Sequence, residues 1–334
     1  MSQVLGDRQT IRRKLHFFYA PIEAQLAEVE RTLTEEIGSD YPAIDELLKH
    51  GFSLGGKRLR PALLLLSAKA IGEITREHLT LAAVVEMIHT ATLVHDDVLD
   101  EAQMRRYRQT VNARWSNESS VLLGDYLFSH AFYLASTLDT TFGCRVIGRA
   151  TNIVCEGELR QVNSRGNFHL SEEEYLSIIE GKTGELCACC CQLGAHYAGA
   201  DPALVTAMSR FGRDLGVAFQ IADDLLDVLG DEPTTGKSLG TDLEKQKMTL
   251  PLIRLLDQVS PAERAELVEV LAGPVAPARE VLAGWFARTD ALAYARDVAN
   301  SLARRGVEEL AGLPRNDAKK ALEAVAEFVV SRRL

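Results

Sequence analysis

Two short aspartate-rich runs, at 95–100 and 223–227, interrupt apolar, helix-forming stretches of this 334-residue chain. In each run the first and last aspartates are four residues apart, so on a helix they lie one turn apart on the same face. Carboxylates gathered on an apolar wall are costly unless a cation neutralises them. The runs therefore favour a fold in which two helices face each other across a cavity that holds hard divalent cations.

Hydrophobic periodicity predicts that the chain is all-α. Apolar residues recur at spacings of three and four through most of the sequence, for example over 79–95 and 203–229. Ser171 with Glu174 has the pattern of a capping box at the start of a helix. Alternating strand patterns and Asn-Gly or Asp-Gly hairpin turns are missing from the sequence.

Length and composition fit one large domain, since 46% of the residues are hydrophobic and no low-complexity tract divides the chain. We expect a single helical bundle over 1–334 around a central apolar cavity. The helices of 1–50 would form a packing or dimer arm. A C-terminal helical cap would occupy about 279–334.

The charge balance narrows the class of partner and the location. The chain has 47 acidic and 37 basic residues, for a net charge of -10, which argues against nucleic-acid binding. No apolar run approaches the roughly 18 residues that a membrane-spanning helix needs. We therefore expect a cytoplasmic protein without a transmembrane segment.

Four of the six cysteines lie together at 187–191. Their spacing does not match the paired Cys-x2-Cys pattern of zinc sites, and no histidine partner is suitably placed. We interpret them as small packing residues, with metal binding or redox chemistry as the alternative.

The aspartates are suited to magnesium. Mg²⁺ prefers oxygen ligands and commonly bridges substrate phosphates to one or two carboxylates. Asp96 and Asp100 on one wall and Asp223 on the other suit this role. The remaining aspartates, Asp97, Asp224 and Asp227, would support these ligands or replace them.

Basic residues gather in four other places, and phosphate oxygens need such charge-assisted donors. These places are the segment GGKRLRP at 55–61, Arg105-Arg106, Lys182-Thr183, and Lys237 with Lys247. Together with two carboxylate walls they fit two diphosphates, one held through metal and one held directly by cations.

In this order, the motifs resemble those of the trans-isoprenyl diphosphate synthases, the polyprenyl synthetase family. The matching segments are 55–61, 95–106, LGDYL at 123–127, Lys182-Thr183, 219–227 and 236–247. The resemblance implies the isoprenoid synthase fold, a homodimer and about three Mg²⁺ per site. It also implies the condensation of isopentenyl diphosphate with an allylic diphosphate (geranyl, farnesyl or geranylgeranyl) into an all-trans polyprenyl diphosphate.

The resemblance implies roles for individual residues as well. The catalytic positions match Asp96, Asp97, Asp100, Arg105, Lys182, Asp223, Asp224 and Asp227. The magnesium ligands match Asp96, Asp100 and Asp223. The substrate-binding positions match Lys57, Arg60, His89, Arg105, Arg106, Lys182, Thr183, Gln220, Lys237 and Lys247. Among these, the counterparts of Lys57, Arg60, His89 and Arg106 hold isopentenyl diphosphate in the family, and that of Arg105 contacts the allylic diphosphate.

Product length is a further implication of the resemblance. In the family, bulky residues four or five positions before the first aspartate run block the channel, whereas this chain has Ala91 and Thr92 there. A lower stop would come from Phe128, Phe132 or Tyr133. This resembles medium- and long-chain members such as octaprenyl synthases and implies a product of roughly thirty to fifty carbons. A farnesyl or geranylgeranyl product is the alternative.

One segment of the chain departs from the family pattern. After Arg106 the family usually has Gly-x-Pro-Thr, but this chain has YRQT at 107–110, so the loop there is expected to be stiffer or differently directed.

Three other functions compete with this interpretation. The first is that of a non-catalytic subunit of a heteromeric synthase, although such subunits commonly lose an aspartate run. The others are a class I terpene cyclase or head-to-head synthase, for which 55–61 is not expected, and a helical scaffold, which leaves the aspartates unexplained.

Overall fold

The computed structural model describes residues 17–229 and 241–331, and this part of the chain is almost entirely helical. The all-α prediction is confirmed. The longer helices are α2 (Glu23–Glu36), α4 (Leu59–Ile71), α5 (Arg76–Leu99), α7 (Asn117–Ser136), α8 (Phe142–Asn163), α10 (Glu185–Tyr197), α11 (Pro202–Leu229), α17 (Ala291–Glu309) and α18 (Asp317–Val330). The other helices are η1 (Ala20–Ile22), α3 (Pro42–Ser53), α6 (Val111–Arg114), α9 (Glu172–Ile179), η2 (Glu180–Gly184), α13 (Thr241–Glu244), α14 (Leu250–Gln258), α15 (Pro261–Leu271), α16 (Val275–Phe286) and η3 (Leu310–Gly312).

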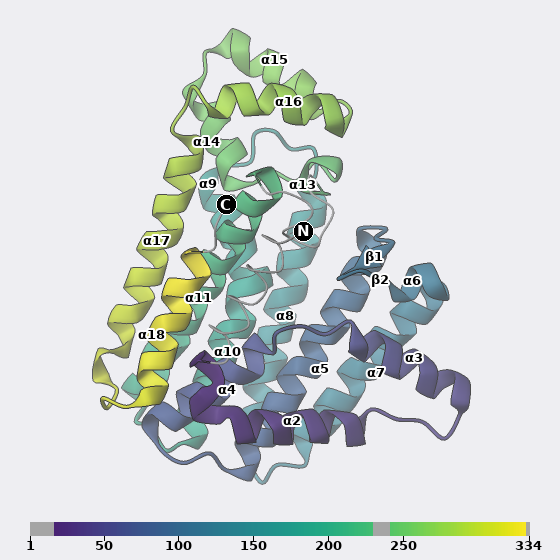
Figure 1. Ribbon diagram of the computed structural model, residues 1–334, viewed down its shortest axis with the longest axis vertical. Helices are drawn as coiled ribbons and strands as arrows, with labels where there is room; N and C mark the ends of the chain where they lie inside the picture. The colour runs from purple at the N-terminus through teal and green to yellow at the C-terminus, as the bar shows by residue number, and fades with distance from the viewer. Residues whose placement is uncertain (1–16, 230–240, 332–334) are drawn as a thin grey trace.

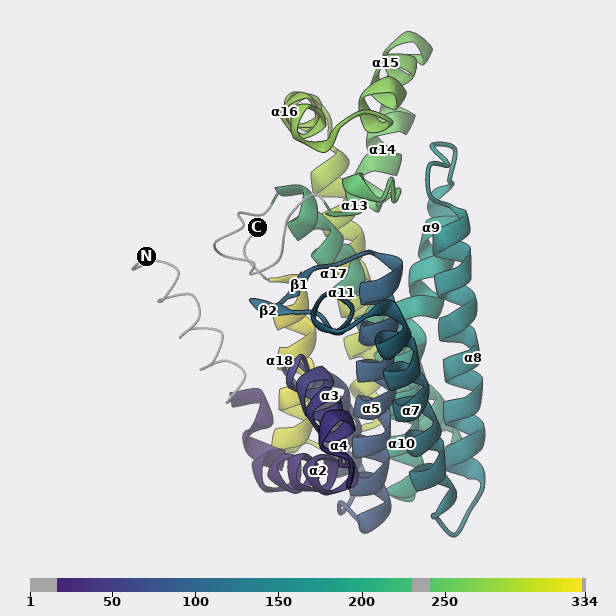
Figure 2. The ribbon, with the colours of Figure 1, turned by 90° about the vertical axis from the view of Figure 1, so that its right-hand side faces the viewer.

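The helices that carry the aspartate runs, α5 and α11, belong to one lengthwise bundle. In both views α5, α7, α8, α10 and α11 run along the long axis of the molecule, α2 crosses one end, and α14 to α16 lie at the other (Figures 1 and 2). Helix α10 packs against both α5 and α11. The two runs are therefore carried by helices that share a neighbour.

Two buried apolar clusters meet along α11. Phe211 and Leu215 belong to the larger cluster, which is formed mainly by α4, α5, α7 and α10. Ile221 and Leu225 belong to the smaller cluster, formed with α9 and with α14 to α17. Burying one such side chain contributes roughly 1.5–3 kcal/mol. The second aspartate run, which overlaps this end of α11, is thus anchored by apolar contacts on either side of Asp223.

The terminal segments pack against the sides of the bundle. Helix α2 contacts α4 and α5, and α17 lies along α11. Helix α18 contacts α4 and α17, so the end of the chain returns to the first helices (Figure 1).

A small hairpin follows α5, where the sequence pattern showed no strand. Its strands are β1 (Met104–Arg105) and β2 (Arg108–Gln109). Both turn residues, Arg106 and Tyr107, have positive φ, of 52° and 67°, as a type I′ turn requires. The hairpin escapes prediction because Gly, Asn or Asp usually fills such positions.

The cysteine cluster lies inside the bundle. The side chains of Cys187, Cys189, Cys190 and Cys191 are buried on α10, and all six cysteines are free thiols. Burial raises the pKa of each of these four thiols, which disfavours the thiolate that metal or redox chemistry needs. No helix in the described residues is long and apolar enough to span a bilayer.

Candidate functional site

The first aspartate run lies at the C-terminal end of α5. The helix begins after Thr75, whose backbone N–H donates to His78 Nδ1 at 2.9 Å. Asp96 and Asp97 occupy the last turn, and Asp100 is the C-terminal cap. Because the C-terminal end of a helix carries partial negative charge, these carboxylates need positive partners.

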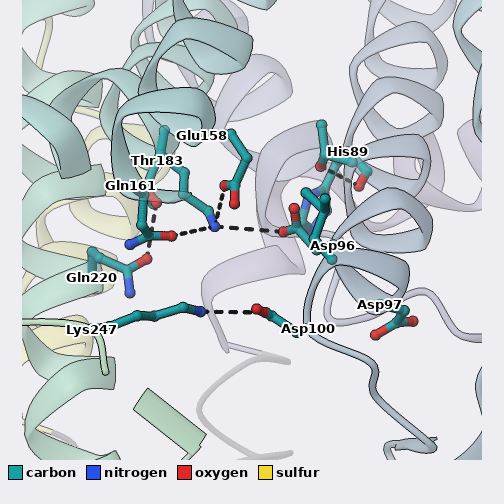
Figure 3. A network of polar contacts seen from close by, with 12 residues as sticks. His89, Asp96, Asp97, Asp100, Glu158, Gln161, Thr183, Gln220 and Lys247 are labelled. Atoms are coloured by element: carbon teal, nitrogen blue, oxygen red, sulfur yellow. Dashed lines mark hydrogen bonds and ion pairs between the residues drawn. The ribbon is translucent and has the colours of Figure 1, made fainter. Parts of the chain in front are cut away.

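Asp96 faces a lysine from a neighbouring helical turn. Its Oδ2 lies 3.9 Å from Lys182 Nζ, which also pairs with the carboxylate of Glu158 and donates to Gln161 Oε1 at 2.7 Å. Figure 3 shows Asp96, Glu158 and Gln161 around this contact. Burial raises the pKa of Asp96 to about 6, and the charge of Lys182 opposes that rise.

Local backbone geometry brings Lys182 to this position. Lys182 and Thr183 lie in η2, a single turn of π-helix between α9 and α10, and such turns are frequent at functional sites. Helix α8 approaches this turn closely at Gly157, where a Cβ would lie 2.6 Å from the Lys182 backbone nitrogen. Only glycine fits there.

Asp97 has a different partner and lies apart from the contacts between Asp96, Glu158 and Gln161 (Figure 3). Its side chain is 2% exposed, and Arg105 Nη2 lies 2.8 Å from its Oδ1. Burial raises the pKa of Asp97, and the hydrogen bond and charge of Arg105 oppose the rise. Arg105 lies on β1, so the hairpin delivers this cation.

Asp100 is held by two cations. Arg165, in the connection between α8 and α9, donates from Nη2 to Asp100 Oδ1 at 2.8 Å. Lys247, just before α14, donates to Asp100 Oδ2 at 3.3 Å. The Gly166 N–H donates to Gln246 O at 3.0 Å, which fastens the two connecting segments together.

In the second aspartate run, on α11, Asp224 is the most enclosed. Its side chain accepts a hydrogen bond from Tyr175 Oη at 2.6 Å and one from Gln220 Nε2 at 2.8 Å. Burial raises the pKa of Asp224 to about 8. Asp227 accepts the backbone N–H of Asp242 at 3.2 Å, and Asp223 is half-buried.

Two consecutive residues connect the aspartate runs. Lys182 reaches toward Asp96, and the next side chain, Thr183, donates from Oγ1 to Gln220 Oε1 at 2.9 Å. Gln220 in turn donates to Asp224. One polar network therefore extends from α5 through η2 to α11, as Figure 3 shows.

The donor set fits divalent cations that arrive with a phosphate ligand. Within the described residues, no group of three or more His, Cys, Asp and Glu side chains forms a metal site by itself. Mg²⁺ is usually held through one or two carboxylates, several waters and substrate phosphates. Asp96 and Asp100 on one wall, with Asp223 on the other, would hold it in that way.

Two of the cations expected to hold isopentenyl diphosphate, Arg60 and Arg106, lie near His89. Arg60 Nη1 donates to His89 Nε2 at 3.0 Å. Burial, followed by the charges of Arg60 and Arg106, holds the pKa of His89 well below its usual value, so the imidazole is neutral. A Cβ at Gly56 would lie 2.3 Å from Arg106 Nη2. Lys57 has an exposed side chain on the same loop.

The remaining cation of that loop, Arg58, points into the protein. It has a φ of 54° and pairs with Glu86, which is 1% exposed, at 2.7 Å and with Glu30. Arg58 therefore fastens the loop to α2 and α5.

The residues expected to set product length lie on α5 and α7. Ala91 is fully buried, and Thr92 donates from Oγ1 to His89 O at 2.8 Å. Phe128 stacks on His95 with ring centroids 6.1 Å apart, and Phe132 approaches α8 at Gly148.

Several polar residues of the site had no sequence signal. Glu158, Gln161, Arg165 and Tyr175 lie in ordinary amphipathic helices or at their ends, where a charge usually indicates a solvated face. Of the expected site residues, Lys237 lies outside the described residues.

Comparison with known proteins places this geometry in context. The model of the family described as Polyprenyl synthetase matches residues 41–283. The octaprenyl diphosphate synthase of Escherichia coli (strain K12) is 36% identical over 316 residues, covering 92% of this chain and 95% of that protein. The heptaprenyl diphosphate synthase component 2 of Geobacillus stearothermophilus is 36% identical over 322 residues, covering 96% and 99%.

A solved structure is equally similar. The polyprenyl synthase of Caulobacter crescentus CB15, complexed with calcium and isoprenyl diphosphate, superimposes with a TM-score of 0.89 and 38% identity. The match covers 96% of this chain and 98% of that one.

Proposed function

We propose a specific reaction for this chain on the premise that it belongs to the polyprenyl synthetase family. The chain is a prenyltransferase that joins isopentenyl diphosphate to an allylic diphosphate and makes an all-trans polyprenyl diphosphate. The observation that carries this proposal is the polar network from Asp96 through Lys182 and Thr183 to Gln220 and Asp224, which links the two aspartate runs across one site.

The first step is the loss of diphosphate from the allylic substrate. Divalent cations, when bound at Asp96, Asp100 and Asp223, would neutralise that leaving group. Lys182 lies beside Asp96 and Lys247 beside Asp100, and both lysines would bind the oxygens of the leaving diphosphate. A pair of unit charges 4 Å apart is worth on the order of 4 kcal/mol at an effective dielectric constant of 20, so a few such contacts account for a large fall in the barrier.

The second step forms the carbon–carbon bond. Arg60 and Arg106 would hold the diphosphate of isopentenyl diphosphate, with neutral His89 fixing the side chain of Arg60. The double bond of isopentenyl diphosphate attacks the allylic cation, and a proton then leaves to an oxygen of the released diphosphate. The apolar interior excludes water, which would otherwise quench the cation.

We propose a product of roughly thirty to fifty carbons, because Ala91 and Thr92 are small at the positions where bulky residues shorten the product in the family. The experiment is to incubate the purified chain with farnesyl and isopentenyl diphosphates, with and without Mg²⁺, and to size the products. Long products that require Mg²⁺ are expected. A limit of fifteen or twenty carbons would refute the proposed length.

We propose that the active species is a homodimer. A heteromeric assembly is a second candidate, because one relative is named as component 2 of a heptaprenyl diphosphate synthase. Condensation by the purified chain alone supports the homodimer, whereas an inactive chain would favour the heteromer. Sedimentation of the active preparation gives the number of subunits.

A further inference from the structure

Glu158 is a largely buried acid on α8 that lies outside both aspartate runs. We propose that Glu158 is a positioning residue, which holds Lys182 so that Asp96 stays open to a divalent cation. The inference rests on the function proposed above and assigns a role to a residue that no sequence motif singled out.

The contacts of the lysine ammonium group are unequal. Lys182 Nζ pairs closely with Glu158 and donates to Gln161 Oε1 at 2.7 Å, but lies 3.9 Å from Asp96 Oδ2. Glu158 and Gln161 are three residues apart, so they share one face of α8. That face forms a two-residue cradle that holds the ammonium group just beyond hydrogen-bond distance of Asp96 (Figure 3).

The backbone supports this cradle. Gly157 brings α8 against the backbone of η2, since a Cβ there would lie 2.6 Å from Lys182 N and 3.0 Å from Gly181 C. The π-turn then directs Lys182 toward α8 and Thr183 toward Gln220. The close approach places the backbone of Lys182 against α8, so its ammonium group reaches the carboxylate of Glu158 on the same helix.

Charge balance explains why the cradle matters. The side chains of Lys182, Glu158 and Asp96 are 19%, 17% and 21% exposed. The ammonium group of Lys182 pairs with Glu158 and faces Asp96. One cation between two carboxylates leaves one negative charge for a metal ion to neutralise.

Removing the charge of Glu158 would change this balance. Among the described residues, Lys182 would keep Asp96 as its only carboxylate partner within 4 Å, and its flexible stem would let it close the gap of 3.9 Å. A divalent cation would then have to displace an ammonium group from Asp96. The variant would bind metal less tightly, although no metal ligand had been altered.

The experiment compares Glu158→Gln with wild type in the full-length enzyme. Calorimetry measures Mg²⁺ binding in the presence of inorganic diphosphate, and kinetics give the Mg²⁺ concentration for half-maximal condensation of farnesyl and isopentenyl diphosphates. We expect the dissociation constant for Mg²⁺ and the Mg²⁺ concentration for half-maximal condensation each to rise about tenfold in Glu158→Gln. The matched control is Glu156→Gln, which removes one negative charge from an exposed position on the same helix and is expected to change neither value.

A second variant separates charge from shape. The double variant Glu158→Gln with Gln161→Glu moves the carboxylate one turn along α8, to the other partner of Lys182. If the negative charge of the carboxylate on α8 holds Lys182, this double variant returns both Mg²⁺ values to within about twofold of wild type. The double variant also keeps the cradle charged, so it tests the inference even if Glu158→Gln fails to fold.

The outcomes are distinct from a failure of the proposed function. If wild type alone does not condense the substrates, the proposed homodimeric enzyme is wrong, whereas Mg²⁺ binding by calorimetry still tests the inference. If wild type is active and Glu158→Gln binds Mg²⁺ normally while losing only thermal stability, Glu158 is merely structural and the inference is overturned. The inference is equally overturned if the double variant stays about tenfold weakened, because charge would then not be the cause.

Discussion

The two aspartate runs have the same spacing but are embedded differently. In the first, Asp97 is held by Arg105 and Asp100 by Arg165 and Lys247. In the second, Asp224 is held by hydrogen bonds from Tyr175 and Gln220. Equal spacing in sequence therefore does not imply equal electrostatics in the fold.

The difference suggests a division of labour. Cations hold the first run, and we propose that Lys182, Arg165 and Lys247 give way to a metal ion and turn to a diphosphate. Neutral donors at the second run fix Asp224 in place, and Asp223 is the residue of this run that we propose as a metal ligand. The predictions below test whether this division holds.

The largest loss of activity is expected when the proposed metal ligand of either run is replaced. Asp96→Asn and Asp223→Asn each remove a carboxylate proposed to bind metal, so each should lower the rate of condensation by about a thousandfold or more. The rate is measured with farnesyl and isopentenyl diphosphates at saturating Mg²⁺. Asp139→Asn, at an exposed turn, is the control and should retain full activity. A double variant of Asp96 and Asp223 with full turnover would contradict the proposed site.

The next effect concerns the ionic partner of the first run. Arg105→Ala leaves the buried Asp97 carboxylate without its counter-ion, and breaking such a pair costs roughly 3 kcal/mol of unfolding free energy. Urea denaturation followed by circular dichroism measures the change. Arg108→Ala, on the facing strand of the same hairpin, removes an exposed arginine that donates to Ser53 and should cost less than about 1 kcal/mol. Equal losses in the two variants would argue against a special role for the Asp97–Arg105 pair.

A smaller loss is expected for the neutral partner of the second run. Tyr175→Phe removes the O–H that donates to Asp224, which should cost about 1–2 kcal/mol of unfolding free energy. The same denaturation experiment applies, with Tyr133→Phe at an exposed position as the control. A loss as large as that of Arg105→Ala would show that the two runs are held equally strongly, and the comparison would fail.

The all-α fold and the two aspartate runs could be recognised from the sequence because both produce regular patterns in it. A helix period survives along α5 and α11, and Asp96 and Asp223 each interrupt an apolar helix in a way that surface acids do not. The cations of 55–61 stand out because glycines precede them and a proline follows. Even there, the sequence does not reveal that Arg58 faces the protein interior, since only the left-handed backbone at that residue turns it toward Glu86.

The partners from other elements left no such signal. Glu158 and Gln161 have the spacing of any solvated helix face, and their approach to Lys182 depends on Gly157 and on one π-turn. Arg165 reaches Asp100 only because two connecting segments meet. These contacts are set by tertiary packing, which a pattern along one chain does not encode.

The smallest effect concerns the turn that presents Arg105 to the first run. Tyr107 has a φ of 67°, which costs an L-residue roughly 1–2 kcal/mol, and the family resemblance places glycine at this position. Tyr107→Gly relieves that strain but adds roughly 0.5–1 kcal/mol of unfolded-state entropy, so a net stabilisation of about 0.5 kcal/mol is expected in urea denaturation. Tyr107→Ala is the matched control, because it removes the ring and keeps the strain. If Tyr107→Ala stabilises the protein as much as Tyr107→Gly, the stabilisation comes from removing the ring and not from relieving the backbone. The hairpin would then hold Arg105 without backbone strain.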